Sequence, residues 1–169
     1  YRDHRNGKAT DASLAIAQDD SIREAIALQE AVGLESITDG EFRRASYWSS
    51  FVERVDGLDI KDAAFTFRDE CGHEQAFTAP HVSGPVRRQQ AIAVDEFNFV
   101  RASTSQTPKT TLPSPPSMHF WRVDQGIDKA VYPDAKSYFT DLAAVYRQEI
   151  AALAAAGSTY IQLDDLFWD

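Results

Sequence analysis

Two adjacent carboxylates, Asp164 and Asp165, stand at the end of a short apolar run in "YIQLDD". Carboxylates at the end of a strand can hold an ammonium group, ligate a metal ion or move protons. Acids in this position also serve as helix caps or solvated turn residues. The pair by itself therefore leaves a binding role and a purely structural role equally open.

Two further segments place polar or aromatic residues after short apolar runs. "TDGE" carries Asp39 and Glu41, and "LPSPPSMHFW" carries Ser114, His119 and Trp121. In parallel α/β folds the functional groups gather at the carboxyl ends of the strands, so all three segments should face one side of a sheet. The set indicates acids beside an aromatic surface, where an exposed Trp121 would offer a flat face to a heterocycle. A core position for Trp121 stays open.

The segment "CGH" contains the only cysteine, Cys71, two residues before His73. Zinc requires three or four ligands, and this segment supplies two candidates in a predicted turn. We therefore interpret it as an ordinary turn and assign no metal ligand within the 169 residues. A single cysteine also cannot form an internal disulfide.

The elements that must position these residues follow from periodicity, turn residues and prolines. Helices are predicted over 11–32, 45–55, 94–103 and 137–156, short strands over 34–38, 81–86, 109–112 and 159–163, and a hairpin over 58–80 around a polar centre. About four strands separated by helices imply parallel pairing through crossovers and an α/β fold. Length alone favours an open sheet, because a closed eight-stranded barrel takes roughly 250 residues.

Composition limits the function classes. The 169 residues are 43% hydrophobic, which is ordinary for a soluble globular protein. Their net charge of −9 argues against nucleic acid as a partner. The sequence shows neither an apolar stretch of membrane-spanning length nor the pattern of a secretory signal, so we expect no membrane partner and a cytoplasmic location. The start lacks an initiator Met and a leading strand, so we expect residues to be missing upstream.

In order along the chain, three segments resemble the catalytic barrel of cobalamin-independent methionine synthase and, more closely, its single-domain relatives. The segments are "ALQEAVGLESITDGEFRR", "TPKTTLPSPPSMHFW" and "YFTDLAAVYRQEIAALAAAGSTYIQLDD". The resemblance implies a (β/α)8 barrel, similar to that of uroporphyrinogen decarboxylase. Residues 1–169 would then be one domain that forms about the first half of the barrel, with the hairpin near 58–80 as an insertion. A half barrel exposes apolar edges, so we expect a segment of a longer protein.

The resemblance also implies a reaction, the transfer of a methyl group from 5-methyltetrahydrofolate or another donor to the thiol of homocysteine. The family's homocysteine-binding acids match Glu41 and Asp164, and its pterin-stacking Trp matches Trp121. Ser114, at the same strand end as Trp121, completes the predicted substrate-binding residues. The family's zinc ligands match positions beyond the last residue, so zinc is expected as a cofactor whose ligands lie outside this segment, together with the catalytic residues.

Two departures from the family pattern affect these expectations. "PSPPS" replaces the family's Thr-Gly-Pro-Val-Thr loop, which weakens the folate contact, and Asp165 replaces a Glu. Relatives of this kind use other methyl donors or attach other groups to other thiols, so a related alkyl transferase is one alternative. A decarboxylase-like member and a non-catalytic member of the same barrel superfamily are the others. The decarboxylase would need arginines for several carboxylates, whereas the strand ends here carry acids.

Overall fold

The computed structural model describes residues 4 and 6–165. The first long element is helix α2, Asp11–Ala31, close to its predicted bounds. Thr10 caps it, because its hydroxyl accepts a hydrogen bond from the backbone N–H of Ser13 at 3.2 Å. Gly33, with a φ of 84°, supplies the left-handed conformation that ends the helical turn.

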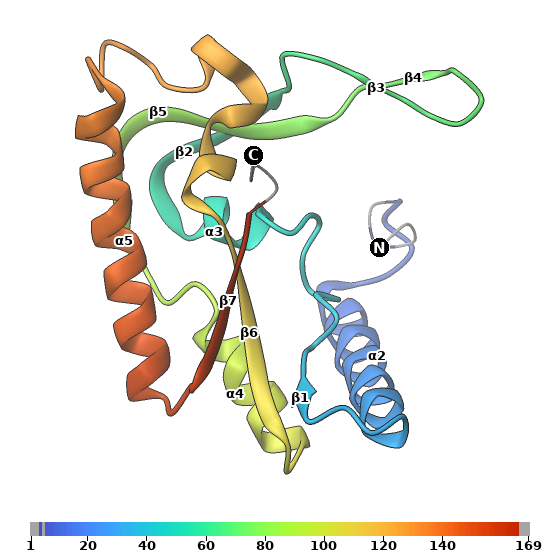
Figure 1. Cartoon of the computed structure of the whole chain (residues 1–169). Helices are drawn as coiled ribbons and strands as arrows, with labels where there is room; N and C mark the ends of the chain where they lie inside the picture. Colours follow the sequence, from blue (N-terminus) through green and yellow to red (C-terminus); the bar gives the residue numbers. More distant parts are fainter. Residues whose placement is uncertain (1–3, 5, 166–169) are drawn as a thin grey trace.

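A parallel sheet lies at the centre of the fold (Figure 1). Its strands are β1 (Ser36–Ile37), β6 (Thr107–Pro113) and β7 (Tyr160–Asp164), in the order β1-β6-β7. Helices α4 (Val94–Ser103) and α5 (Ala135–Ala155) precede β6 and β7 in the chain, as the sequence predicts. The structure thus confirms an α/β fold with a parallel sheet.

The two faces of this sheet differ in polarity. Leu112 of β6 is 1% exposed and belongs to the main apolar core, and Thr110 of the same face is also buried. The neighbouring residues Lys109 and Thr111 point to the opposite face, since side chains alternate along a strand. Thr111 is paired in register with Gln162, and Pro113 with Asp164. The polar face therefore carries side chains from both strands at the C-terminal end of β7, where Asp164 and Asp165 lie.

An antiparallel pair forms a second sheet. Strand β2, Val55–Asp62, pairs with β5, Thr78–Arg88, and the short strands β3, Phe67–Arg68, and β4, Glu74–Gln75, continue outward as an arm (Figure 1). The alternation that predicts a hairpin over 58–80 is thus matched by strands that extend further on both sides. The separate strand predicted over 81–86 is wrong, because these residues continue β5. Three parallel strands, rather than about four, are present in the described residues.

The helix predicted over 45–55 is also shorter than expected. Helix α3 spans only Ser49–Glu53, and Val55 already begins β2. The Ser49 hydroxyl accepts hydrogen bonds from the backbone N–H groups of Ala45 and Ser46, at 3.0 and 3.3 Å. These bonds hold the preceding residues in a turn, which explains why the apolar spacing of this segment does not produce a longer helix.

The connection after β6 contains two short 3-10 turns, η1 (Pro115–Met118) and η2 (Phe120–Gln125). The prolines end the strand there because they lack the N–H donor. Met118 and helix α5 join the main core with strands β2 and β5. Among the described residues, no helix is both long enough and apolar enough to cross a membrane.

Candidate functional site: an acid pocket at the strand ends

The turn after β1 positions Glu41, the first of the predicted acids. Glu41 has a φ of 57°, which is uncommon for a residue with a side chain. Two side chains hold this turn, because Asp39 accepts a hydrogen bond from the Glu41 N–H at 3.0 Å and Thr38 accepts one from the Gly40 N–H at 3.2 Å. An unusual backbone conformation with such support is often found at functional sites.

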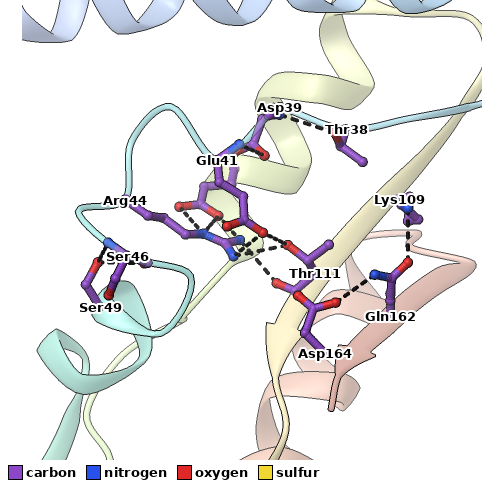
Figure 2. Close-up of polar contacts among 12 residues, drawn as sticks. Thr38, Asp39, Glu41, Arg44, Ser46, Ser49, Lys109, Thr111, Gln162 and Asp164 are labelled. Atoms are coloured by element: carbon purple, nitrogen blue, oxygen red, sulfur yellow. Dashed lines mark hydrogen bonds and ion pairs between the residues drawn. The ribbon is translucent and has the colours of Figure 1, made fainter. Parts of the chain in front are cut away.

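Glu41 is fixed by contacts with β6 and with a buried arginine (Figure 2). The Thr111 hydroxyl donates to Glu41 Oε1 at 2.7 Å, and Arg44 Nη1 lies 3.3 Å from the same oxygen. Arg44 also donates to the Thr111 hydroxyl at 3.1 Å, so the three groups form a closed triangle. This triangle joins the turn after β1 to the neighbouring strand.

Arg44 is buried and forms ion pairs with both Glu41 and Glu96. Its side chain is 3% exposed, and its Nη2 lies 2.6 Å from Oε2 of Glu96, which is 6% exposed. Burial alone would lower the pKa of Arg44, but the hydrogen bond and charge of Glu96, followed by the charge of Glu41, raise it above its usual value. Arg44 is therefore a permanent cation that orients Glu41.

The second predicted acid, Asp164, ends β7 and is oriented by its own strand. Gln162 lies on the same face two residues earlier, and its amide donates to Asp164 Oδ1 at 2.6 Å. Lys109 of β6 donates in turn to Gln162 Oε1 at 3.0 Å. This chain of hydrogen bonds fixes which way the amide points and leaves Asp164 Oδ2 as an acceptor that the Gln162 bond does not use.

Glu41 and Asp164 line one cavity of about 510 Å3, together with Tyr47, Gln162, Leu163 and Asp165. Figure 2 shows Glu41 reaching Thr111 with Asp164 beside it at the end of β7. We call this cavity the acid pocket. It brings together two of the predicted site residues from segments more than a hundred positions apart. Its charge and size suit a small molecule that carries an ammonium group.

Ser114 lies beneath the acid pocket and is 2% exposed. Its backbone N–H donates to the Asp164 carbonyl at 2.9 Å, and its hydroxyl donates to Asp165 Oδ1 at 3.3 Å. A second contact joins its hydroxyl to that of Ser117 at 3.2 Å. Ser114 therefore supports the strand end that carries the acids and is not among the residues that line the cavity.

Trp121 lies outside the acid pocket, in an aromatic cluster with residues of the hairpin arm. The ring centroids of Phe77 and Phe65 are 5.5 and 6.0 Å from that of Trp121, and Phe67 is at 6.2 Å. Together with Phe67, Phe77 and Tyr47, Trp121 lines a cavity of about 450 Å3. Because Tyr47 lines both cavities, this aromatic cavity adjoins the acid pocket.

The described residues of the acid pocket do not fit a zinc centre, because Glu41, Asp164 and Asp165 are the only candidate ligands among them and neither Cys nor His lines the cavity. Within residues 4 and 6–165, a cluster of three mixed ligands occurs only at Asp69, Cys71 and His73, on the outer turn of the arm. We therefore derive no chemical step through zinc from these residues.

Sequence reasoning missed the residues that orient the acids. Arg44 and Thr111 hold Glu41, Gln162 holds Asp164, and Tyr47 lines both cavities. A signal was available for Gln162, because a strand places residues two positions apart on one face. The hydrogen bond from Arg44 to Thr111 joins residues 67 positions apart, so no local sequence pattern predicts it.

Comparison with known proteins identifies the family of the chain. A family model described as "Cobalamin-independent synthase, Catalytic domain" matches residues 2–168. The Bacillus subtilis (strain 168) protein "Uncharacterized protein YxjH" is 31% identical over 165 residues, which cover 96% of this chain and 42% of that protein. A methionine synthase of Sulfolobus acidocaldarius is 28% identical over 163 residues, covering 96% of this chain and 45% of the relative.

Solved structures give the same result for the fold. A B12-independent methionine synthase from Shewanella sp. W3-18-1, in complex with selenomethionine, superposes with a TM-score of 0.74 at 27% identity. The superposition covers 94% of this chain and 44% of that structure. The present chain thus spans less than half the length of these relatives. Because the family model covers nearly all of its residues, the chain belongs to the cobalamin-independent synthase catalytic domain family.

Proposed function

We propose that this chain is part of a methyltransferase that moves a methyl group from 5-methyltetrahydrofolate, or another methyl donor, to the thiol of homocysteine, giving methionine. One observation carries the proposal, the convergence of Glu41 and Asp164 on one small cavity at the carboxyl ends of parallel strands. Membership of the family supports the reaction type, and the names of relatives such as the Sulfolobus methionine synthase support the product.

In this proposal the two acids bind the ammonium group of homocysteine. An ammonium group has three donors, and two carboxylates from different strands can accept from it in a fixed direction. Arg44 and Thr111 keep Glu41 in place, and Gln162 does the same for Asp164. The role of Ser114 is to hold the backbone of Asp164 in position. The thiol end of the substrate would then be directed away from the acids, toward the methyl donor.

The aromatic cavity is the proposed donor site. Trp121 and Phe77 provide aromatic surface next to the acid pocket, and a pterin ring is a flat heterocycle that stacks on such surfaces. The proposed cofactor is zinc, which would bind the thiol and lower its pKa, with ligands in the part of the protein beyond these residues. The roles given above involve only side chains of this chain.

The proposed fold of the complete protein is a (β/α)8 barrel in which β1, β6 and β7 are three of the strands, so that residues 1–169 form part of one domain. The parallel order β1-β6-β7 and the polar face that carries both acids support this proposal. The antiparallel hairpin would be an insertion that places its aromatic residues beside the site.

The test is made on the full-length gene product. Homocysteine and 5-methyltetrahydrofolate are supplied with zinc, and methionine is measured against a second assay with other methyl donors. We expect methionine to form, and we expect Glu41→Gln to lower kcat/KM at least about tenfold, mainly through KM, because it removes a charge-assisted contact. The control is Glu35→Gln, an exposed acid just before β1. Absence of methionine with every donor would refute the proposal.

A further inference from the structure

The outer turn of the arm gathers three side chains that ligate metals. Asp69, Cys71 and His73 lie between β3 and β4, and one ligand atom of each lies within 4.8 Å of the other two. All three residues are exposed, so solvent has direct access to them. The sequence shows the Cys and His, whereas the structure adds the carboxylate as a third ligand.

The backbone of the turn brings these groups together. Asp69 Oδ1 accepts hydrogen bonds from the N–H groups of Cys71 and His73, both at 2.9 Å, and the Asp69 N–H donates to the His73 carbonyl at 3.0 Å. The backbone between Cys71 and His73 turns at Gly72, which has a φ of 81°. These bonds leave Asp69 Oδ2 directed at the imidazole, 3.3 Å from Nδ1.

The Asp69 side chain is also held by a residue of β4, because the Gln75 side-chain amide donates to Asp69 Oδ2 at 3.2 Å. A carboxylate, an imidazole and a thiol form a mixed O, N and S ligand set. Zn2+ accepts all three ligand types, and a three-ligand site leaves a fourth position for water.

We propose that Asp69, Cys71 and His73 form a binding site for one divalent transition-metal ion of the Zn2+ type, with water as the fourth ligand. The site is separate from the acid pocket, because the turn lies at the outer end of the arm (Figure 1). The proposal does not depend on the methyltransferase function. Binding releases the thiol proton as the thiolate bonds to the metal, so affinity should fall as the pH is lowered.

Metal binding at this turn would stabilise the arm. Strands β3 and β4 pair over only two residues each, which gives the arm few ladder hydrogen bonds. Phe67 of β3 stacks on Phe77 with ring centroids 5.0 Å apart, and both rings contact Trp121. A metal ion that links Asp69 to His73 closes the turn, and so restricts the strand that carries Phe67.

The test is a calorimetric titration of the full-length gene product with Zn2+ under reducing conditions, which measures stoichiometry and affinity. Wild type and the variants Asp69→Asn, Cys71→Ser and His73→Gln are compared, with Glu70→Gln as a control carboxylate in the same turn. Each ligand variant should bind one equivalent fewer, or bind that equivalent at least 10–100-fold more weakly, because even outer-shell partners contribute about this much to metal affinity. Glu70→Gln should match the wild type.

A Co2+ titration provides a second measurement, because Co2+ bound to a thiolate gives a charge-transfer absorption. We expect a band in the wild type that Cys71→Ser reduces. Asp69→Asn keeps an oxygen for the two backbone hydrogen bonds, so circular dichroism should show an unchanged fold. Equal Zn2+ stoichiometry and affinity in the wild type and Cys71→Ser would overturn the proposal. Equal losses in Glu70→Gln and Asp69→Asn would also overturn it, because they indicate unspecific attraction to acids.

Discussion

The acid pocket and the outer turn of the arm both collect ionisable side chains, but they do so in opposite ways. Next to the acid pocket, Thr111 reaches Glu41 across 70 positions, and Arg44, which also contacts Glu41, reaches Glu96 across 52. In the outer turn, the hydrogen bonds of Asp69 with other described residues lie within six positions of the chain. The first site depends on the whole fold being in place, whereas the second depends on the conformation of one turn.

This difference has a consequence for how each site responds to change. Arg44 and Glu96 are removed from water, so loss of one leaves the other as an uncompensated charge. The groups of the outer turn remain solvated and can be replaced without such a penalty. Mutations beside the acid pocket should therefore destabilise the protein more than mutations in the outer turn. Binding measurements should show different ligands for the two regions.

The largest effect is expected for Arg44→Met. The side chain is 3% exposed and pairs with Glu96 at 2.6 Å, so its removal should lower the free energy of unfolding by about 3–5 kcal/mol. The matched change in the arm is Arg68→Met, which breaks the exposed pair with Glu74 at 3.5 Å and should cost no more than about 1 kcal/mol. Urea unfolding of the full-length gene product measures both. Similar losses would contradict the contrast between the regions.

Two glycines with nearly the same backbone conformation sharpen the comparison. Gly57 and Gly72 have φ values of 80° and 81°, so alanine at either position should cost about 1–2 kcal/mol in backbone strain. A Cβ at Gly57 would lie 2.4 Å from the Gly84 carbonyl oxygen, whereas one at Gly72 would meet nothing within 4 Å. Gly57→Ala should therefore lose about 1–3 kcal/mol more through overpacking. Equal losses in urea unfolding would show that this contact relaxes freely.

A smaller effect should separate the buried interior of the protein from the outer turn by pH. Burial against Tyr138 and Phe139 lowers the pKa of His119 below 6.5, so the folded state prefers the neutral imidazole. The stability from this preference is present above pH 6.5 and is lost as the pH falls below it. The pKa of Asp69 is lowered from 3.8, so its contribution is lost only in more acidic solution.

Unfolding measured from about pH 7.5 to about pH 5.5 tests this prediction. The wild type should lose stability over this range, and His119→Gln should lose less. Burial also lowers the pKa of His81, which accounts for a remaining pH dependence in the variant. An unchanged dependence in His119→Gln would rule out the proposed contribution of His119.

The long elements of the fold could be predicted from the sequence because their signals are local. Helix α5 has regular apolar spacing, and its bounds agree closely with the prediction. Leu142, Tyr146 and Leu153 are buried as that spacing requires, whereas Ile150 of the same pattern is 39% exposed. Residues 81–86 do form a strand, but they continue β5 and pair antiparallel with β2, because an apolar pattern does not distinguish parallel from antiparallel pairing. Only the contact of β5 with β2 decides that question.

Acids at the strand ends were candidates because they follow apolar runs, and the family resemblance selected Glu41 and Asp164 among them. The structure brings these two into one cavity. Their partners were not predicted. Arg44 reads as an ordinary charged residue in sequence and becomes buried only when Glu96 and Thr111 surround it. Trp121 lies in the adjoining aromatic cavity and not in the acid pocket, because the arm supplies aromatic rings that pack around it, and its predicted contact with a pterin ring stays a prediction.

The central claim, that the acid pocket binds the ammonium group of homocysteine, is tested most directly by calorimetry on the full-length gene product. Homocysteine is compared with its analogue that lacks the amino group, in the wild type and in Asp164→Asn. The wild type should prefer homocysteine by about tenfold to a hundredfold, as expected for a charge-assisted hydrogen bond, and Asp164→Asn should lose most of this preference. An equal preference in both proteins would contradict the claim.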